Sequence, residues 1–114
     1  MSLELSPTHL KSATEISISG TGLTEEDFLE LLELVDSEIA KKQPNLILNL
    51  KNVRILNSLG INTLIKIFTK CRNNGGDMYI VNISDKINHV LLLTKLNTVL
   101  NIANSTAEAE EQLK

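Results

Sequence analysis

A chain of 114 residues is the size of one folded domain, with room for a single buried core. Its apolar fraction of 42% and charged fraction of 22% are ordinary for globular proteins and argue against disorder. A formal net charge of -3 excludes a general attraction to nucleic acid or anionic lipid, and no apolar run reaches the roughly 18 residues that predict a membrane span.

Two short strands are expected at the start of the chain. Leu3 and Leu5 alternate with polar residues, which predicts a short edge strand that ends at Pro7. The segment 15–19, EISIS, alternates in the same way and predicts a half-exposed strand that stops at Gly20.

The first helix is predicted by an acidic capping box and an apolar stripe. In residues 24–27, TEED, Thr24 can cap the helix and Asp27 can reach back to the cap. Apolar residues follow at helical spacing, namely Phe28, Leu31, Leu32, Val35 and Ile39. Acidic residues at the front of this helix and lysines at its end match the helix dipole, and Pro44 closes it.

Strands and helices alternate through the rest of the chain. Leu46, Ile47 and Leu48 in succession predict a strand buried on both faces, as in a parallel sheet covered by helices. The elements expected next are a helix over about 58–72, a strand over 78–83, a helix from Ser84, a strand over 98–102 and a C-terminal helix with a capping box of Ser105 and Glu108. This order predicts an α/β fold in one domain over residues 1–114, with a mixed, mainly parallel sheet of four to five strands and about four packed helices.

Nothing in the sequence has the spacing of a catalytic or metal site, so we expect neither enzyme activity nor a cofactor. His9 and His89 lack a second His or Cys at metal-ligand spacing, which favours ordinary surface or core roles. The glycines of residues 73–77, NNGGD, lack the Lys-Ser/Thr of a phosphate loop and precede a strand, so they predict a helix-ending turn. Aromatic residues, at 3%, are too few for a platform that stacks nucleic-acid bases.

The single cysteine, Cys71, lies on the apolar stripe of the helix expected over 58–72. This position favours a buried structural thiol over a nucleophile. One cysteine cannot form an internal disulfide, and no signal peptide opens the sequence. Together these features predict a cytoplasmic protein.

Residues 54–66, RILNSLGINTLIK, place a polar pair and a glycine where a buried strand gives way to a helix. Asn57 and Ser58 are both residue types that cap helices, so the simplest interpretation is a pair of caps. The alternative is that the Ser58 hydroxyl is a site of modification. The residues alone leave both interpretations open.

From about Glu15 to its end, the chain resembles the STAS domain, specifically the small bacterial anti-sigma-factor antagonists. In that family a buried strand ends in Asn or Asp followed by Leu, here Asn49-Leu50. A short connector then leads to an Asp-Ser-Ser/Ala-Gly motif at a helix start, here Asn57-Ser58-Leu59-Gly60. Three further pairs match downstream, at Gly75-Gly76, Ile83-Ser84 and Leu93-Thr94.

The resemblance implies a partner switch. A family member binds an anti-sigma factor that is also a serine kinase, and this frees the sigma factor. The kinase phosphorylates the motif serine, here Ser58, and a phosphatase reverses the modification. We therefore expect a protein partner, a monomer or weak dimer, and a partner-binding surface that comprises Asn57, Ser58, Leu59 and Asn62 with Gly22, Leu23 and Thr24 of the preceding loop.

Three positions depart from the family pattern. Asn57 replaces an Asp, Leu59 replaces a small residue, and Leu23 replaces the acid of the family's Gly-Glu-Leu-Asp motif, which here is GTGL. Either the partner kinase differs to match, or the surface binds without being phosphorylated. The alternative functions are an accessory subunit that docks on a transporter or larger signalling assembly without phosphorylation, and a sensor of a small ligand or nucleotide.

Overall fold

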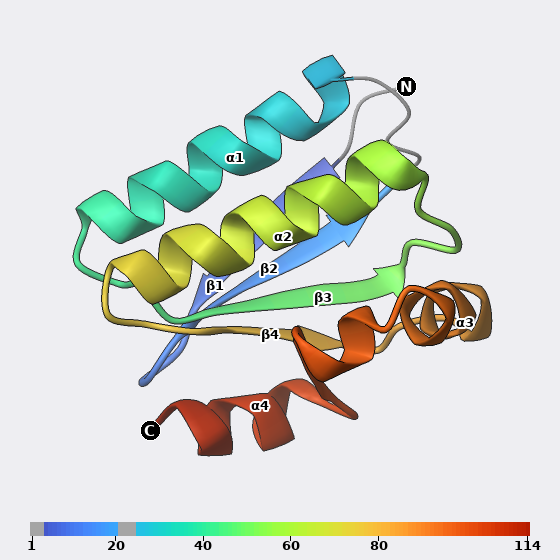
Figure 1. The fold of residues 1–114 in the computed structure, drawn as a ribbon. Coiled ribbons are helices and arrows are strands. Elements are labelled where there is room, and N and C mark those ends of the chain that lie inside the picture. Colours follow the sequence, from blue (N-terminus) through green and yellow to red (C-terminus); the bar gives the residue numbers. More distant parts are fainter. Residues whose placement is uncertain (1–3, 21–24) are drawn as a thin grey trace.

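The structure, a computed structural model, describes residues 4–20 and 25–114. Five strands form one sheet in sequence order, β1 (Glu4–His9), β2 (Thr14–Ser19), β3 (Leu46–Asn52), β4 (Met78–Val81) and β5 (Asn101–Ala103). β1 runs antiparallel to β2, and the other neighbouring pairs are parallel. The predicted mixed, mainly parallel sheet is therefore confirmed (Figure 1).

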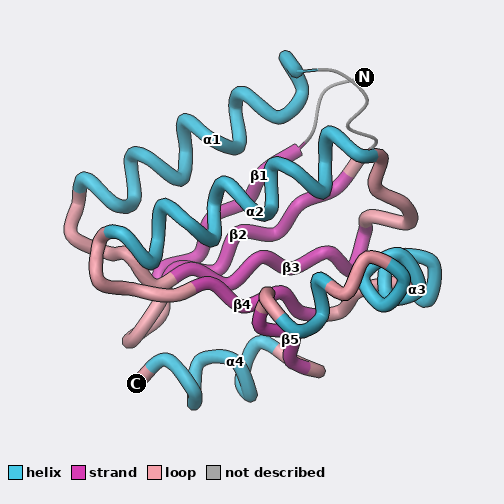
Figure 2. Tube along the Cα trace, viewed as in Figure 1, coloured by secondary structure: helices cyan, strands magenta, loops and turns pink. Residues whose placement is uncertain are grey.

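The helices cover the sheet from both sides. α1 (Glu25–Ala40) and α2 (Ser58–Asn73) lie next to each other on one face, and α4 (Thr106–Leu113) covers the opposite face (Figure 1). α3 (Asp85–Leu93) and the 3-10 helix η1 (Leu96–Thr98) connect β4 to β5, and α3 lies at the end of the sheet where β3 stops (Figure 2). The result is a layered α/β fold with its larger apolar core beneath α1 and α2.

β3 is the central strand, and its composition explains the two-sided core. Leu46, Ile47 and Leu48 are fully buried. Because side chains alternate between the faces of a strand, Leu46 and Leu48 join the cluster beneath α1 and α2, while Ile47 joins the cluster beneath α4. The prediction of a strand buried on both faces is confirmed.

Three strand boundaries differ from the sequence prediction. Pro7 does not end the first strand but lies within β1, opposite Ile16. An edge strand tolerates proline because the missing N–H can be one that would face solvent. β4 ends at Val81, where Asn82 takes a left-handed conformation with φ 58°, and the last strand begins only at Asn101, because residues 96–98 form η1.

The predicted first helix is present as α1, and the apolar residues Phe28, Leu31 and Val35 are buried in the core. Leu3 and the Thr24 cap lie outside the described residues, and so does the side chain of Asp27. The helix expected from Ser84 begins at Asp85, with Ser84 as its N-cap, and the predicted cap at Ser105 is confirmed. Ser84 accepts a hydrogen bond from the Ile87 amide, and Ser105 accepts one from the Glu108 amide.

One carboxylate is buried where the first two strands meet α1. Glu38 is 1% exposed, and its Oε1 lies 2.8 Å from the Thr14 hydroxyl and 2.9 Å from His9 Nε2. Burial acts to raise the pKa of Glu38, but the bonds to Thr14 and His9 and the nearby charge of Lys41 outweigh it, so the pKa lies below its usual range. His9 thus has a structural partner, as the sequence favoured.

Cys71 is fully buried on α2, which confirms its predicted structural role. Burial and the nearby Asp77 carboxylate raise the pKa of its thiol to about 12, so the thiol is not poised for nucleophilic attack. Within the described residues, no group of His, Cys, Asp or Glu is arranged to hold a metal ion. No helix in the described part of the chain has the length and apolar character needed to cross a membrane.

Candidate functional site

The motif that the sequence singled out lies at the carboxyl end of the sheet. Residues 53–57 lead from the end of β3 past α3 into the first turn of α2, and we call this segment the connector (Figure 2). The parallel strands β2, β3 and β4 all end on this side. Binding sites of open α/β sheets gather at this edge, because the loops that follow the strands are free to vary there.

Asn57 caps α2. Its backbone is extended, and its Oδ1 accepts a hydrogen bond from the Gly60 amide at 2.9 Å. The prediction that Ser58 is also a cap is wrong. Ser58 is already the first helical residue. A helix is capped by the side chain of the residue before its first turn, and here that residue is Asn57.

The Ser58 side chain is consequently free for another role. It is exposed and makes no hydrogen bond to any residue in the described part of the chain. Asn62 is also exposed and follows one helical turn later, so the two residues share a face of α2. The structure thus presents a polar face with an accessible hydroxyl at the start of α2.

Gly60 allows the start of α2 to approach α1 closely. A Cβ at this position would lie 3.0 Å from Cδ2 of Leu56 and 3.1 Å from Cζ of Phe28. Both distances are shorter than the usual 3.5–4.0 Å between carbon atoms in contact. Glycine at the fourth motif position therefore lets α2 begin directly against the ring of Phe28.

An apolar groove runs between α1 and α2 beside this polar face. It encloses about 220 Å³ and is lined by Phe28, Leu29, Leu32, Leu59, Thr63 and Lys66. Leu29 is 53% exposed, whereas Leu59 is half-buried and packs against the main core. The sequence places Leu59 in the expected partner-binding surface. In the structure Leu59 both holds α2 on the core and forms part of the groove.

The match to a family model decides the identity of this fold. The model for the STAS domain matches residues 9–109. This chain belongs to the STAS family. A comparison with curated proteins gives no match.

Solved structures share the architecture of this STAS domain. The NMR structure of the protein TM1081 from Thermotoga maritima has a TM-score of 0.84 at 20% identity, covering 94% of this chain and 86% of that one. An anti-sigma factor antagonist from Mycobacterium paratuberculosis has a TM-score of 0.83 at 18% identity, and the match covers 98% of this chain and 94% of that one. The Bacillus cell fate determinant SpoIIAA in its phosphorylated form has a TM-score of 0.71 at 14% identity, and the match covers 99% of this chain and 100% of that one. At these identities the likeness establishes the fold.

The structure brings together four of the predicted site residues of this STAS domain. Asn57, Ser58, Leu59 and Asn62 all lie in or beside the first turn of α2. Gly22, Leu23 and Thr24 lie outside the described residues, so their predicted place beside Ser58 stays a prediction.

Sequence reasoning missed one residue that positions the connector. The Ser84 hydroxyl donates a hydrogen bond to the backbone carbonyl of Arg54 at 2.6 Å, while its oxygen accepts one from the Ile87 amide at 3.1 Å. The cap could be predicted from local sequence, but the bond to Arg54 could not, because no local signal pairs residues 30 positions apart. Ser84 thus fixes α3 to the segment that carries the motif.

Proposed function

We propose that this STAS domain is an anti-sigma-factor antagonist. It acts in the cytoplasm as a binding protein without catalytic activity of its own, and its partner is an anti-sigma factor with serine kinase activity. Phosphorylation of Ser58 switches the complex off. The observation that carries the proposal is the exposed Ser58 hydroxyl, free of bonds to the described residues, at the first helical position beside the α1–α2 groove.

The chemistry places few demands on the substrate protein. A kinase brings ATP, Mg²⁺ and the base, so the substrate supplies only an accessible hydroxyl in a defined position. Ser58 Oγ attacks the γ-phosphorus, ADP leaves, and the hydroxyl proton passes to the base of the kinase. The positive end of the α2 dipole then stabilises the new phosphate, so the modification costs the folded domain little.

The same phosphate opposes binding. A group of about -1.5 to -2 charge beside the α1–α2 groove must lose its hydration when a partner covers Ser58. Removing an unpaired charge from water costs several kcal/mol. The phosphorylated surface is therefore expected to release the partner.

The replacement of the family's Asp by Asn57 fits a matched kinase. Asn57 keeps the capping oxygen, and the first turn of α2 contains no acidic residue. A phosphate on Ser58 therefore meets no like charge within that turn. A kinase that serves this chain should accept a neutral residue before the serine.

A second candidate is a subunit that docks constitutively on a transporter or larger signalling assembly. The observation that favours it is the groove itself, whose apolar lining from Leu29, Leu32 and Leu59 does not depend on Ser58. This candidate predicts partner binding that ATP does not affect.

Phosphate transfer separates the two candidates. The purified protein and a Ser58→Ala variant are incubated with the anti-sigma factor of the same cell and Mg-ATP, then analysed by intact-mass and peptide mass spectrometry. The proposal predicts one phosphate on Ser58 in the natural chain and none in the variant. Absence of phosphate on Ser58 of the natural chain would contradict the proposed switch and leave the constitutive subunit as the better candidate.

A further inference from the structure

A second surface lies on the connector, just before the motif. Ile55 is 60% exposed, although Val53 is 3% exposed and Leu56 packs against the main core. Single exposed apolar residues are common and need no explanation. Ile55 is different because it forms one wall of a hollow together with α3.

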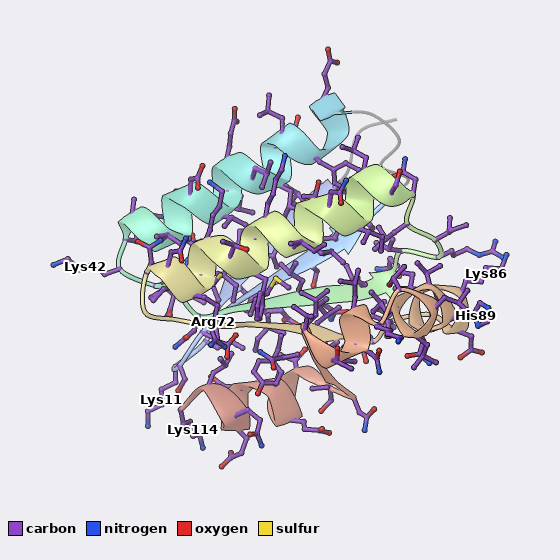
Figure 3. The ribbon with its side chains drawn as sticks, in the orientation of Figure 1. Lys11, Lys42, Arg72, Lys86, His89 and Lys114 are labelled. Carbon is purple, nitrogen blue, oxygen red and sulfur yellow. The ribbon has the colours of Figure 1, made fainter. Side chains whose placement is uncertain are left out.

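The hollow, which we call the Ile55 hollow, is an open depression of about 480 Å³ lined by Ile55, Asp85, Lys86, His89 and Val90. Ile55 and Val90 contribute apolar side chains to its lining, and Lys86 and His89 are exposed residues of the same lining. Figure 3 shows Lys86 and His89 at the end of the molecule opposite Lys42. The hollow is large enough to receive an apolar side chain of another protein.

Hydrogen bonds hold the connector in place on both sides of Ile55. The Val53 amide donates to the Leu50 carbonyl at 3.0 Å, and the Arg54 carbonyl accepts from Ser84 at 2.6 Å. Beyond Ile55, Asn57 is bound through its side chain to the Gly60 amide. A partner therefore meets Ile55 in a fixed position, which lowers the entropy cost of binding.

Two basic residues and one acidic residue lie in or next to the Ile55 hollow. Arg54 and Lys86 are exposed, and Asp85 is the acidic residue in the lining. Among the described residues, neither Arg54 nor Lys86 forms an ion pair. The excess of one positive charge, contributed by Arg54 beside the hollow, favours an acidic partner segment over a basic one.

We propose that the Ile55 hollow binds an acidic segment of the partner protein through one apolar anchor side chain. The inference rests on the proposed function for the identity of that partner. Ile55 and Ser58 are three residues apart, which is at most about 10 Å of chain. An interface of ordinary size, about 800 Å² on each protein, covers both positions at once. The partner therefore contacts α3 as well as the start of α2.

The test measures the affinity of the purified anti-sigma factor by titration calorimetry. Ile55→Asp should weaken binding about tenfold or more, as for an interface hot spot. Lys86→Glu should weaken it severalfold and reduce its dependence on salt. The matched controls are Val99→Asp, at a side chain that is 51% exposed beyond α3, and Lys42→Glu at the opposite end of the molecule, and both should bind like the natural chain.

The outcomes distinguish this inference from the proposed function. If the natural chain binds and both Ile55→Asp and Lys86→Glu bind equally well, the Ile55 hollow is not part of the interface, and the proposed function stands. If the natural chain itself does not bind, the proposed function fails and this inference fails with it. Thermal unfolding of each variant checks that its fold is intact, and Lys86→Glu provides the test if Ile55→Asp does not fold.

Discussion

Ser84 and Arg54 are joined by a hydrogen bond of 2.6 Å from the Ser84 hydroxyl to the Arg54 carbonyl. The same hydroxyl oxygen caps α3 by accepting from the Ile87 amide. One side chain thus stabilises a helix start and holds the connector that leads to Ser58. The start of α2 depends in this way on α3, which is distant from it in sequence.

The first prediction concerns this bond. Ser84→Ala should lower the free energy of unfolding by about 1–3 kcal/mol, because both the cap and the bond to Arg54 are lost. Ser105→Ala is the matched control, since Ser105 caps α4 by accepting from Glu108. Urea unfolding should show the larger loss for Ser84→Ala, and hydrogen exchange should show faster exchange in the connector for that variant alone. Equal effects in both variants would show that the bond to Arg54 contributes nothing.

The second prediction separates the two polar residues of the motif. Asn57→Ala should cost about 1 kcal/mol of stability, because the Gly60 amide loses its acceptor. Ser58→Ala should leave stability nearly unchanged. Asn57→Asp should hold or slightly raise stability, since aspartate caps as well as asparagine and favours the helix dipole. Urea unfolding of the three variants measures these differences. If Ser58→Ala lowers the free energy of unfolding as much as Asn57→Ala does, Ser58 acts as a cap after all.

These two predictions show which parts of the site could be deduced from sequence. Asn and Ser are both good capping residues, so the choice between Asn57 and Ser58 depends on which residue begins the helix. A shift of one position decides that choice, and helix boundaries are uncertain by more than one residue. The Arg54 bond and the Ile55 hollow require contacts between segments far apart in the chain, and local pattern carries no information on them.

The fold was easier to predict from the sequence than the site, because its signals are local. The run Leu46–Leu48 predicted the central strand, and the helix expected over 58–72, whose apolar stripe includes Cys71, is α2. The error at Pro7 arose because proline is tolerated only on the free side of an edge strand, and sequence does not show which side is free. The β-branched residues near Thr98 favoured a strand, but the chain forms η1 there before entering β5.

The third prediction is a pH dependence. The pKa of Glu38 is lowered in the folded state, so its contribution to stability is fully present above the unfolded pKa of about 4.3. That contribution is lost as the pH falls through the lower folded pKa. Unfolding measured between about pH 7 and pH 3 should therefore show a steeper loss for the natural chain than for Glu38→Gln, which cannot ionise. If stability falls equally steeply with pH in both proteins, ionisation of Glu38 does not contribute to the pH dependence of stability.

The fourth prediction concerns the α1–α2 groove. Leu29→Gln should leave stability nearly unchanged and weaken partner binding by about 1 kcal/mol or more, because Leu29 is 53% exposed on the groove. Leu59→Glu should weaken partner binding and also lower the stability of the fold, since Leu59 packs against the core as well. Val99→Gln, at 51% exposure, is the control and should bind normally. Affinity by calorimetry and stability by thermal unfolding distinguish these cases, and unchanged affinity for Leu29→Gln would remove the groove from the interface.

A phosphate on Ser58 should turn binding off, and the affinities of the unmodified and phosphorylated forms decide whether it does. The unmodified protein and the protein phosphorylated on Ser58 are separated and each titrated with the same anti-sigma factor in the presence of ADP. We expect tight binding of the unmodified form and an affinity lower by at least about tenfold, or 1.4 kcal/mol, for the phosphorylated form. Equal affinities of the two forms would contradict this expectation.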